Sequence, residues 1–141
     1  MSWLLDGNLI VALLIDAHPN HHRARAWFSS ITDEVVTCSV TEGTYLRLHM
    51  RMAADRSAAS AWQVLAQFQS NPMHRFIDDG FTYAEVSSQK LQGHKQVTDA
   101  WLAQLARRHG SRLATLDAGL VSEHVDVGFL IPELPLATAQ P

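Results

Sequence analysis

The sequence predicts an α/β domain built around a mostly parallel sheet, and three observations indicate this class. Short apolar runs suited to buried strands alternate with longer segments whose apolar residues recur at helical spacing. No two of these runs are joined by a tight hairpin turn, as antiparallel strands commonly are. The 141 residues are 47% hydrophobic, which suits one packed domain and excludes an intrinsically disordered chain.

The first third of the chain predicts two strands, each followed by helical sequence. An apolar run at residues 3–5 fits a buried strand, and apolar residues at helical spacing continue from 9 to 14. A second helix is expected over residues 19–31, because the proline at its start suits a first helical turn. Residues 35–38 predict the second strand, and a helix containing residues 45–48 follows it.

The rest of the chain continues this alternation. We expect further helices over residues 57–69 and 97–109, and further strands over residues 75–78, 113–116 and 129–131. Asn71-Pro72 ends the first of these helices, because proline cannot continue a helix. Gly110 is a natural C-terminal cap for the second.

We expect one domain over residues 1–133 and a flexible C-terminal tail over residues 134–141, which is bounded by prolines. The longest apolar run, residues 9–15, is too short to span a membrane, and aspartates on both sides make it unlike a signal peptide. The single Cys38 excludes an internal disulfide and fits a reducing compartment. These features predict a soluble, cytoplasmic protein with no membrane partner.

The charge balance narrows the possible functions. The chain carries 11 Lys and Arg against 14 Asp and Glu, a net charge of −3 with neutral histidines. This balance argues against a protein that coats DNA or anionic membranes through bulk positive charge. An enzyme acting on nucleic acid stays possible, because such enzymes use acidic residues to hold a metal ion.

Four acidic residues fall where a parallel sheet places its binding site, beyond the carboxyl ends of the strands. Asp6 and Asp117 each end a predicted strand, and Glu42 comes shortly after another. Asp99 lies at the start of a predicted helix and aligns with its apolar face. Four carboxylates at one sheet edge would repel one another unless a cation compensated them. Oxygen ligands alone favour Mg²⁺ or Mn²⁺ over zinc.

Each acid also has a purely structural explanation. The two aspartates at strand ends suit turns or helix N-caps. Glu42 completes a capping-box pattern that starts at Ser39. Asp99 could interact with the positive helix N-terminus, with Thr98 as the cap.

Histidines cluster near the second predicted helix, at positions 18, 21 and 22. Zinc sites need a further matched pair of ligands, which the surrounding sequence lacks. We therefore interpret His18, His21 and His22 as residues of a loop and a helix start.

Four segments occur in an order that makes the chain similar to a known family. They read LLDGNLI at 4–10, TEGTYLR at 41–47, HKQVTDA at 94–100 and LATLD at 113–117. They resemble the PIN-domain family, and specifically the VapC-type toxins of bacterial toxin–antitoxin pairs, over residues 3–131. The resemblance implies a three-layer α/β/α sandwich with a mostly parallel central sheet. It also implies a Mg²⁺-dependent endoribonuclease, for which Mn²⁺ is an alternative cofactor.

The resemblance assigns the catalytic and metal-binding roles to the same four acids. Asp6 and Asp99 would be the principal ligands, and Glu42 and Asp117 would complete the site. The family's Asp-x-Asn pattern is matched by Asn8, which, like Thr98, would support the site without binding metal. Two departures alter its surroundings, because Gly7 replaces a common hydroxyl residue and Gly43-Thr44 replaces the usual Asn-Gly.

Partners follow from the same resemblance: an RNA substrate, a cognate VapB-type antitoxin of a type II toxin–antitoxin pair, and a second copy in a homodimer. Arg47 and Lys95 lie beside acidic motifs and are the best candidates for contacts with RNA phosphates. Two alternatives stay open, a phosphotransfer domain (receiver or aspartate-phosphatase) and a catalytically inactive PIN module that binds RNA or protein.

Overall fold

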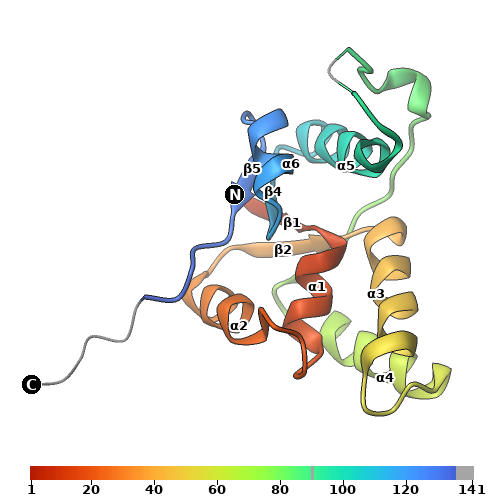
Figure 1. The fold of residues 1–141 in the computed structure, drawn as a ribbon, viewed down its shortest axis with the longest axis vertical. Helices are drawn as coiled ribbons and strands as arrows, with labels where there is room; N and C mark the ends of the chain where they lie inside the picture. Colours follow the sequence, from red (N-terminus) through yellow and green to blue (C-terminus); the bar gives the residue numbers. More distant parts are fainter. Residues whose placement is uncertain (90, 136–141) are drawn as a thin grey trace, which may run out of the picture.

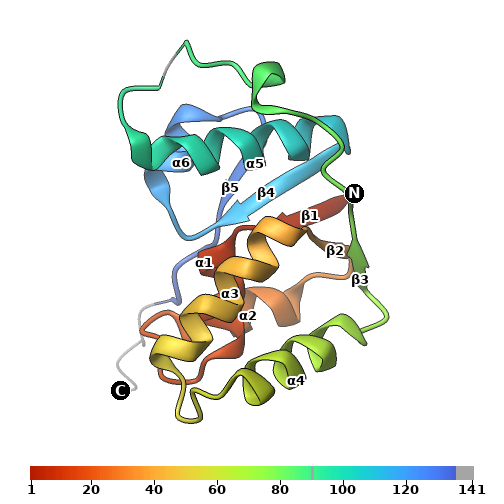
Figure 2. The same cartoon turned by 90° about the vertical axis from the view of Figure 1, so that its right-hand side faces the viewer.

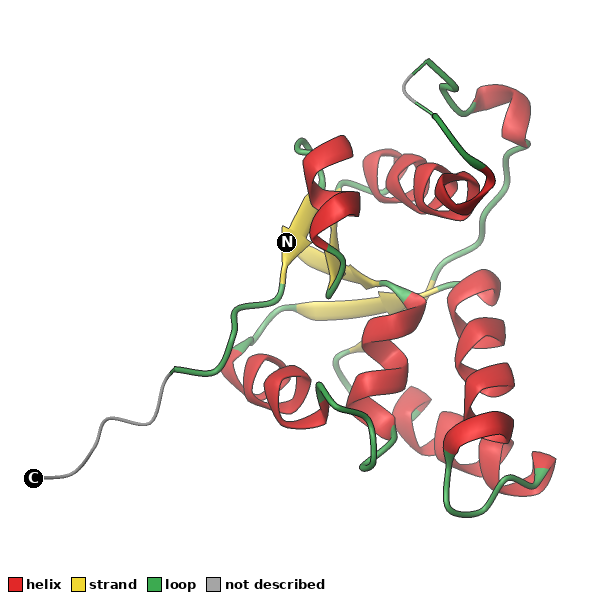
Figure 3. Ribbon diagram, viewed as in Figure 1, coloured by secondary structure: helices red, strands yellow, loops and turns green. Residues whose placement is uncertain are grey.

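A five-stranded sheet forms the centre of the computed structural model, which describes residues 1–89 and 91–135. The strand order is β3-β2-β1-β4-β5, and every neighbouring pair is parallel. Helices cover both faces of the sheet (Figures 1 and 3). The predicted three-layer α/β/α class is therefore confirmed.

The strands are β1 (Ser2–Leu5), β2 (Glu34–Thr37), β3 (His74–Phe76), β4 (Ser111–Thr115) and β5 (Gly128–Leu130). The α-helices are α1 (Gly7–Leu14), α2 (His21–Ser30), α3 (Ser39–Met52), α4 (Ala58–Gln69), α5 (Val97–Arg108) and α6 (Ala118–Glu123). Two short 3-10 turns, η1 (Tyr83–Glu85) and η2 (His94–Gln96), lie between β3 and α5. No helix among the described residues is long and apolar enough to cross a membrane.

Alternating residues of β1 supply two separate apolar cores, one on each face of the sheet. Trp3 and Leu5 pack in the core formed with α1 to α4, whereas Leu4 packs with α5 and α6. Figure 2 shows α5 and α6 on one side of the sheet and the first four helices on the other. Because β1 is the middle strand, both of its faces are buried, which explains its wholly apolar run.

Several boundaries differ from the expected ones for local reasons. Helix α2 starts at His21 instead of Pro19, because a turn closed by the His21 N–H and the His18 carbonyl, 3.0 Å apart, precedes it. Cys38 does not end β2 but occupies the N-cap of α3. Gly110 has a φ of +63° and follows α5, as its predicted capping role requires.

The end of the described chain lies against α2. The Arg23 side chain donates hydrogen bonds to the carbonyls of Ile131 and Pro132, the latter at 3.2 Å. Ile131 is fully buried in the core beneath α1 and α2. The expected tail lies, from residue 136 onward, outside the described residues.

Helices α1 and α3 lie close together at Gly7. A Cβ atom placed on Gly7 would stand 2.6 Å from the Thr44 Cγ2 and 2.8 Å from the Thr44 Cβ. No side chain larger than hydrogen fits this position without separating the two helices. The glycine that departs from the family pattern is thus matched by the threonine opposite it.

We expect Gly7→Ala to lower the free energy of unfolding by about 1–3 kcal/mol, because α1 and α3 must move apart. Gly93→Ala is the matched control, since a Cβ there meets no atom within 4 Å. Chemical denaturation of both variants measures the difference. Equal stability of Gly7→Ala and the wild type would contradict the close approach.

Candidate active site

Three aspartates meet at the carboxyl edge of the sheet, on the face covered by α5. Asp6 directly follows β1, Asp117 lies two residues after β4, and Asp99 lies in the first turn of α5. Each of the three is close enough to affect the ionisation of another, because Asp6 and Asp117 both raise the pKa of Asp99. The structure therefore brings together three of the four predicted site residues.

Asp6 is the most buried of the three, with 7% of its surface exposed. The Thr115 hydroxyl donates a hydrogen bond of 2.7 Å to its Oδ2. Burial raises the pKa of Asp6, while the bonds from Thr115 and the Gly7 amide oppose the rise. Although Asp6 occupies the N-cap position of α1, its side chain makes no capping bond, so the N-cap explanation does not account for it.

Asp99 is half-buried, and its pKa is raised to about 6. Burial is the main cause, followed by the negative charges of Asp6, Asp117 and Glu123. Thr98 does not cap α5, because the helix already begins at Val97 with Gln96 in the cap position. The Thr98 side chain is exposed and lies next to Asp99 in sequence.

Asp117 is exposed and caps α6. Its Oδ1 accepts hydrogen bonds from the Gly119 N–H at 2.9 Å and the Leu120 N–H at 3.3 Å. The N-cap explanation is confirmed for this residue. Because both bonds use Oδ1, capping leaves Oδ2 available for another ligand.

Thr115 joins two of the aspartates and was not anticipated from the sequence. Its hydroxyl donates to Asp6 and accepts from the Asp117 backbone N–H at 3.0 Å. The side chain is completely buried, so this single hydroxyl fixes the ends of β1 and β4 relative to each other. The sequence did carry a sign of this role, since Thr115 is a polar residue in the otherwise apolar run of residues 113–116 and lies two positions before Asp117.

Glu42 is held by residues of β2 and α4. Its Oε2 accepts hydrogen bonds from the Thr37 hydroxyl at 2.7 Å and the Gln69 amide at 2.9 Å. Thr37 also contacts His74 Nε2 at 2.7 Å, on the sheet face that carries α1 to α4. The predicted capping box is wrong as well, since α3 is capped by Cys38 together with Thr41.

The expected convergence of four carboxylates is therefore not found. Among the described residues, no three His, Cys, Asp or Glu side chains stand close enough together to hold a metal ion. Alternate residues of a strand face opposite sides of the sheet, which explains why Glu42 does not join the aspartates. Asp6 lies two residues after Leu4, whose side chain faces α5. Thr37, which bonds Glu42, lies two residues after Val35, whose side chain faces α1 to α4.

The residues expected to support the site differ in their placement. Asn8 is exposed and lines an open pocket of about 540 Å³ beside Asp117, together with His18. Arg47 and Lys95 are both exposed, on α3 and η2 respectively. Of the three clustered histidines, His18 accepts a hydrogen bond from the Asn20 N–H at 3.0 Å and His21 contacts the Ala12 carbonyl at 2.8 Å.

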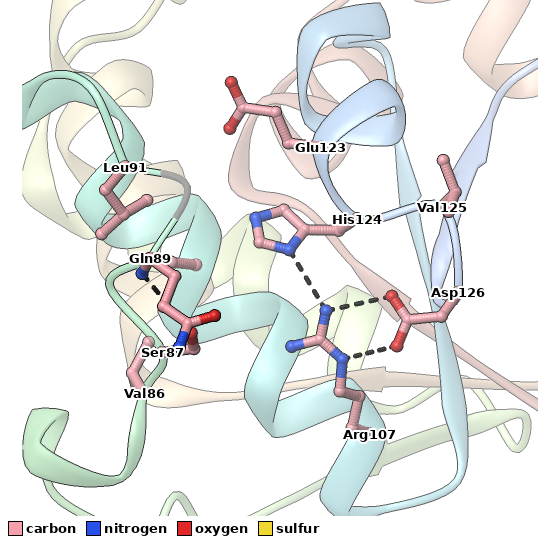
Figure 4. A pocket seen from close by; sticks show the side chains of 10 residues that line it. Val86, Ser87, Gln89, Leu91, Arg107, Glu123, His124, Val125 and Asp126 are labelled. Atoms are coloured by element: carbon pink, nitrogen blue, oxygen red, sulfur yellow. Dashed lines mark hydrogen bonds and ion pairs between the residues drawn. The ribbon is translucent and has the colours of Figure 1, made fainter.

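A second pocket, of about 230 Å³, lies between α5, α6 and the side chains of Val86, Ser87, Gln89 and Leu91. Glu123 of α6 lines it and is bonded by Gln96, which ties α6 to the start of α5 near Asp99. Arg107 is held there by Asp126 through bonds of 2.6 and 3.0 Å (Figure 4). Glu123 is thus a further acid near the site. The positive charge of Arg107 is already paired with Asp126.

The carboxylate oxygens of the three aspartates are the type of donor that a hard divalent cation takes, although in this conformation the side chains stand too far apart to hold one. Within residues 1–89 and 91–135, no Lys, Arg or His lies within salt-bridge distance of Asp6, Asp99 or Asp117. Burial, and after it the uncompensated negative charge of the neighbouring acids, raises the pKa of Asp99. Carboxylate oxygens are the donors that Mg²⁺ and Mn²⁺ prefer, so the donor set fits the cofactor that the resemblance implies.

Comparisons with known proteins identify the relatives of this chain. Mycobacterium tuberculosis ribonuclease VapC29 is 42% identical over 132 residues, which are 94% of this chain and 98% of that protein. Ribonuclease VapC38 of the same organism is 40% identical over 121 residues, 83% of this chain and 86% of that protein.

Solved structures show the same fold. The crystal structure of Mycobacterium tuberculosis VapC20, a sarcin-ricin loop cleaving toxin, has a TM-score of 0.67 at 17% identity, covering 94% of this chain and 99% of that one. FitAB bound to a DNA fragment gives a TM-score of 0.67 at 22% identity, covering 96% of this chain and 99% of that one. The sequence profile of the PIN domain matches residues 3–123. The chain therefore belongs to the PIN-domain family.

Proposed function

We propose that this protein is a divalent-metal-dependent endoribonuclease and the toxin of a type II toxin–antitoxin pair. The observation that carries the proposal is the group of three aspartates from β1, α5 and β4 without a cationic partner among the described residues. The 42% identity to a protein named a ribonuclease supports RNA as the substrate. A phosphodiester is the substrate class for which acid-bound metal ions are suited.

Mg²⁺ or Mn²⁺ would activate a water and neutralise the charge that develops on the phosphoryl group. Asp6 and Asp99 are the proposed principal ligands, and Asp117 contributes the oxygen that capping leaves available. Thr115 keeps Asp6 oriented toward them. Glu42 would join this group once its side chain leaves Thr37 and Gln69.

The remaining partners follow from family membership. A VapB-type antitoxin would restrain the nuclease, and a second copy of the chain would form a homodimer. Arg47 and Lys95 would contact RNA phosphates, and Asn8 and Thr98 would support the acidic group. The cytoplasm, where RNA is available, is the proposed location.

We expect Asp6→Asn to lower Mg²⁺-dependent cleavage of total RNA by at least about 100-fold, since losing even a partner of a metal ligand costs about 10–100-fold. Asp16→Asn is the control, because the Asp16 side chain is 98% exposed. Circular dichroism checks that both variants fold. Full cleavage by Asp6→Asn, or by the wild type in EDTA, would contradict the mechanism. A trapped aspartyl-phosphate would favour the phosphotransfer alternative.

The pKa of Asp99 predicts how stability depends on pH without metal. A carboxyl whose pKa is higher in the folded chain than its ordinary value of 3.8 binds its proton more tightly when folded. Stability from this group is therefore complete below about pH 4 and is lost as the pH rises through about 6.

In EDTA at about pH 7.5, we expect Asp99→Asn to melt roughly 3–5 °C higher than the wild type, the shift produced by about 1 kcal/mol. The difference should vanish near pH 4, because both side chains are then neutral. Added Mg²⁺ should raise the melting temperature of the wild type more than that of the variant. Thermal melts measure all three effects. If Asp99→Asn instead melted lower than the wild type at pH 7.5, the burial and repulsion of the Asp99 charge would not be what limits stability.

Thr115→Val should lower Mg²⁺ affinity and cleavage by about 10–100-fold, because Asp6 loses the hydroxyl that orients it. Thr115→Ser keeps the hydroxyl and should stay near wild-type activity. Calorimetric titration with Mg²⁺ separates metal binding from catalysis. Equal Mg²⁺ affinity in the two variants would show that the Thr115 hydroxyl does not position Asp6.

A further inference from the structure

Eight of the nine arginines fall into two groups, according to whether a carboxylate or a backbone carbonyl of the chain already holds them; the ninth, Arg25, lies apart on α2. Arg75, Arg107 and Arg108 pair with the carboxylates of Glu34, Asp126 and Glu85. Arg23 and Arg112 donate to backbone carbonyls of the C-terminal segment. Figure 4 shows how fully Arg107 is engaged by Asp126 and His124. These five side chains serve the fold.

A second group gathers on α3 and the turn after it. Arg47 and Arg51 are exposed and one helical turn apart, so they lie on the same face about 6 Å apart along the axis. Arg56 is exposed in the turn that leads to α4. In the part of the chain that the structure describes, no carboxylate lies within salt-bridge distance of any of the three. We call Arg47, Arg51 and Arg56 the α3 arginines.

Two contacts connect Arg47 to Gly7, the residue that follows Asp6. Arg47 Nη2 donates to the Thr44 hydroxyl at 3.3 Å. Thr44 in turn fills the space that a side chain on Gly7 would take, with its Cγ2 2.6 Å from that Cβ position. Gly7 directly follows Asp6. Arg47 therefore lies about one helical turn beyond Thr44, and Thr44 lies against the residue that follows Asp6.

We propose that the α3 arginines bind the phosphate backbone of single-stranded RNA and lead it to the aspartate cluster. The inference rests on the proposed ribonuclease function and adds the path of the substrate. A cluster of carboxylates repels phosphate, so the chain needs cations beside it that are not already paired. Uncompensated arginines in continuity with the site meet this need.

A second copy of the chain fits the same face less well. A two-fold contact centred on Arg47 and Arg51 would bring each of these arginines near its own copy. Met50 and Met52, which are 42% and 41% exposed on α3, are the large apolar side chains that such a contact could bury, and both lie beside arginines. The charge of the face thus favours a polyanion over another copy.

The test measures binding of a fluorescein-labelled single-stranded RNA of about 12 nucleotides by fluorescence anisotropy in EDTA, where no cleavage occurs. The titration is repeated from about 50 to about 300 mM KCl. Each lost phosphate contact reduces the slope of log K against log [KCl] by about 0.7 for single strands. We expect a reduction of about 0.7 for Arg51→Gln and about 1.4 for Arg47→Gln combined with Arg51→Gln.

Arg25→Gln is the matched control, because it removes the same charge from an exposed position on α2. It should leave the slope unchanged. In Mg²⁺, Arg51→Gln should raise the KM for RNA and leave kcat unchanged, since the residue binds substrate without touching the reacting atoms.

Three results would overturn the proposal. If the wild type cleaves RNA but the double variant keeps the wild-type slope, the α3 path is wrong and the ribonuclease function stands. If the double variant sediments as a monomer where the wild type sediments as a dimer, and its RNA affinity is unchanged, the face is a contact between copies. If the wild type neither binds nor cleaves RNA, the proposed function itself fails.

Discussion

The hydrogen bond from the Thr115 hydroxyl to Asp6 joins the ends of the two central strands, and the arrangement of the site depends on it. The same hydroxyl accepts from the Asp117 backbone, so one buried oxygen fixes two of the three clustered aspartates. The bond is possible because the register that pairs Leu5 with Ala114 continues to Asp6 and Thr115. Parallel pairing of β1 and β4 thus places the acids as well as the core.

Bringing these acids together without a cation works against folding. Asp6 is buried and Asp99 half-buried, and both have raised pKa values for that reason. The structure tolerates the repulsion because the sheet and two apolar cores fix the backbone around it. Some charges elsewhere are compensated locally, as in the bond between Arg107 and Asp126. The three aspartates and the α3 arginines, by contrast, have no ion-pair partner among the described residues.

Sequence patterns predicted the fold class, the existence of every strand and α-helix except the short α6, and the acids at the sheet edge. They were less accurate at boundaries, since the turn before His21 and the capping of α3 by Cys38 depend on local hydrogen bonds. They did not show that Glu42 would bond to Thr37 and Gln69. Gln69 lies 27 residues further along the chain, and no local pattern records such a contact.

The sequence by itself determined which residues are apolar, where helices and strands alternate, and that acids follow the strands. These properties are local, because they depend on spacing along the chain. Only the tertiary structure decided which acids meet, because side-chain parity places Asp6 and Thr115 on one face of the sheet and Thr37 on the other. The tertiary structure also decided which arginines form ion pairs, because their carboxylate partners lie far away in sequence, as Glu34 does from Arg75. Contacts of that kind exist only once the chain has folded.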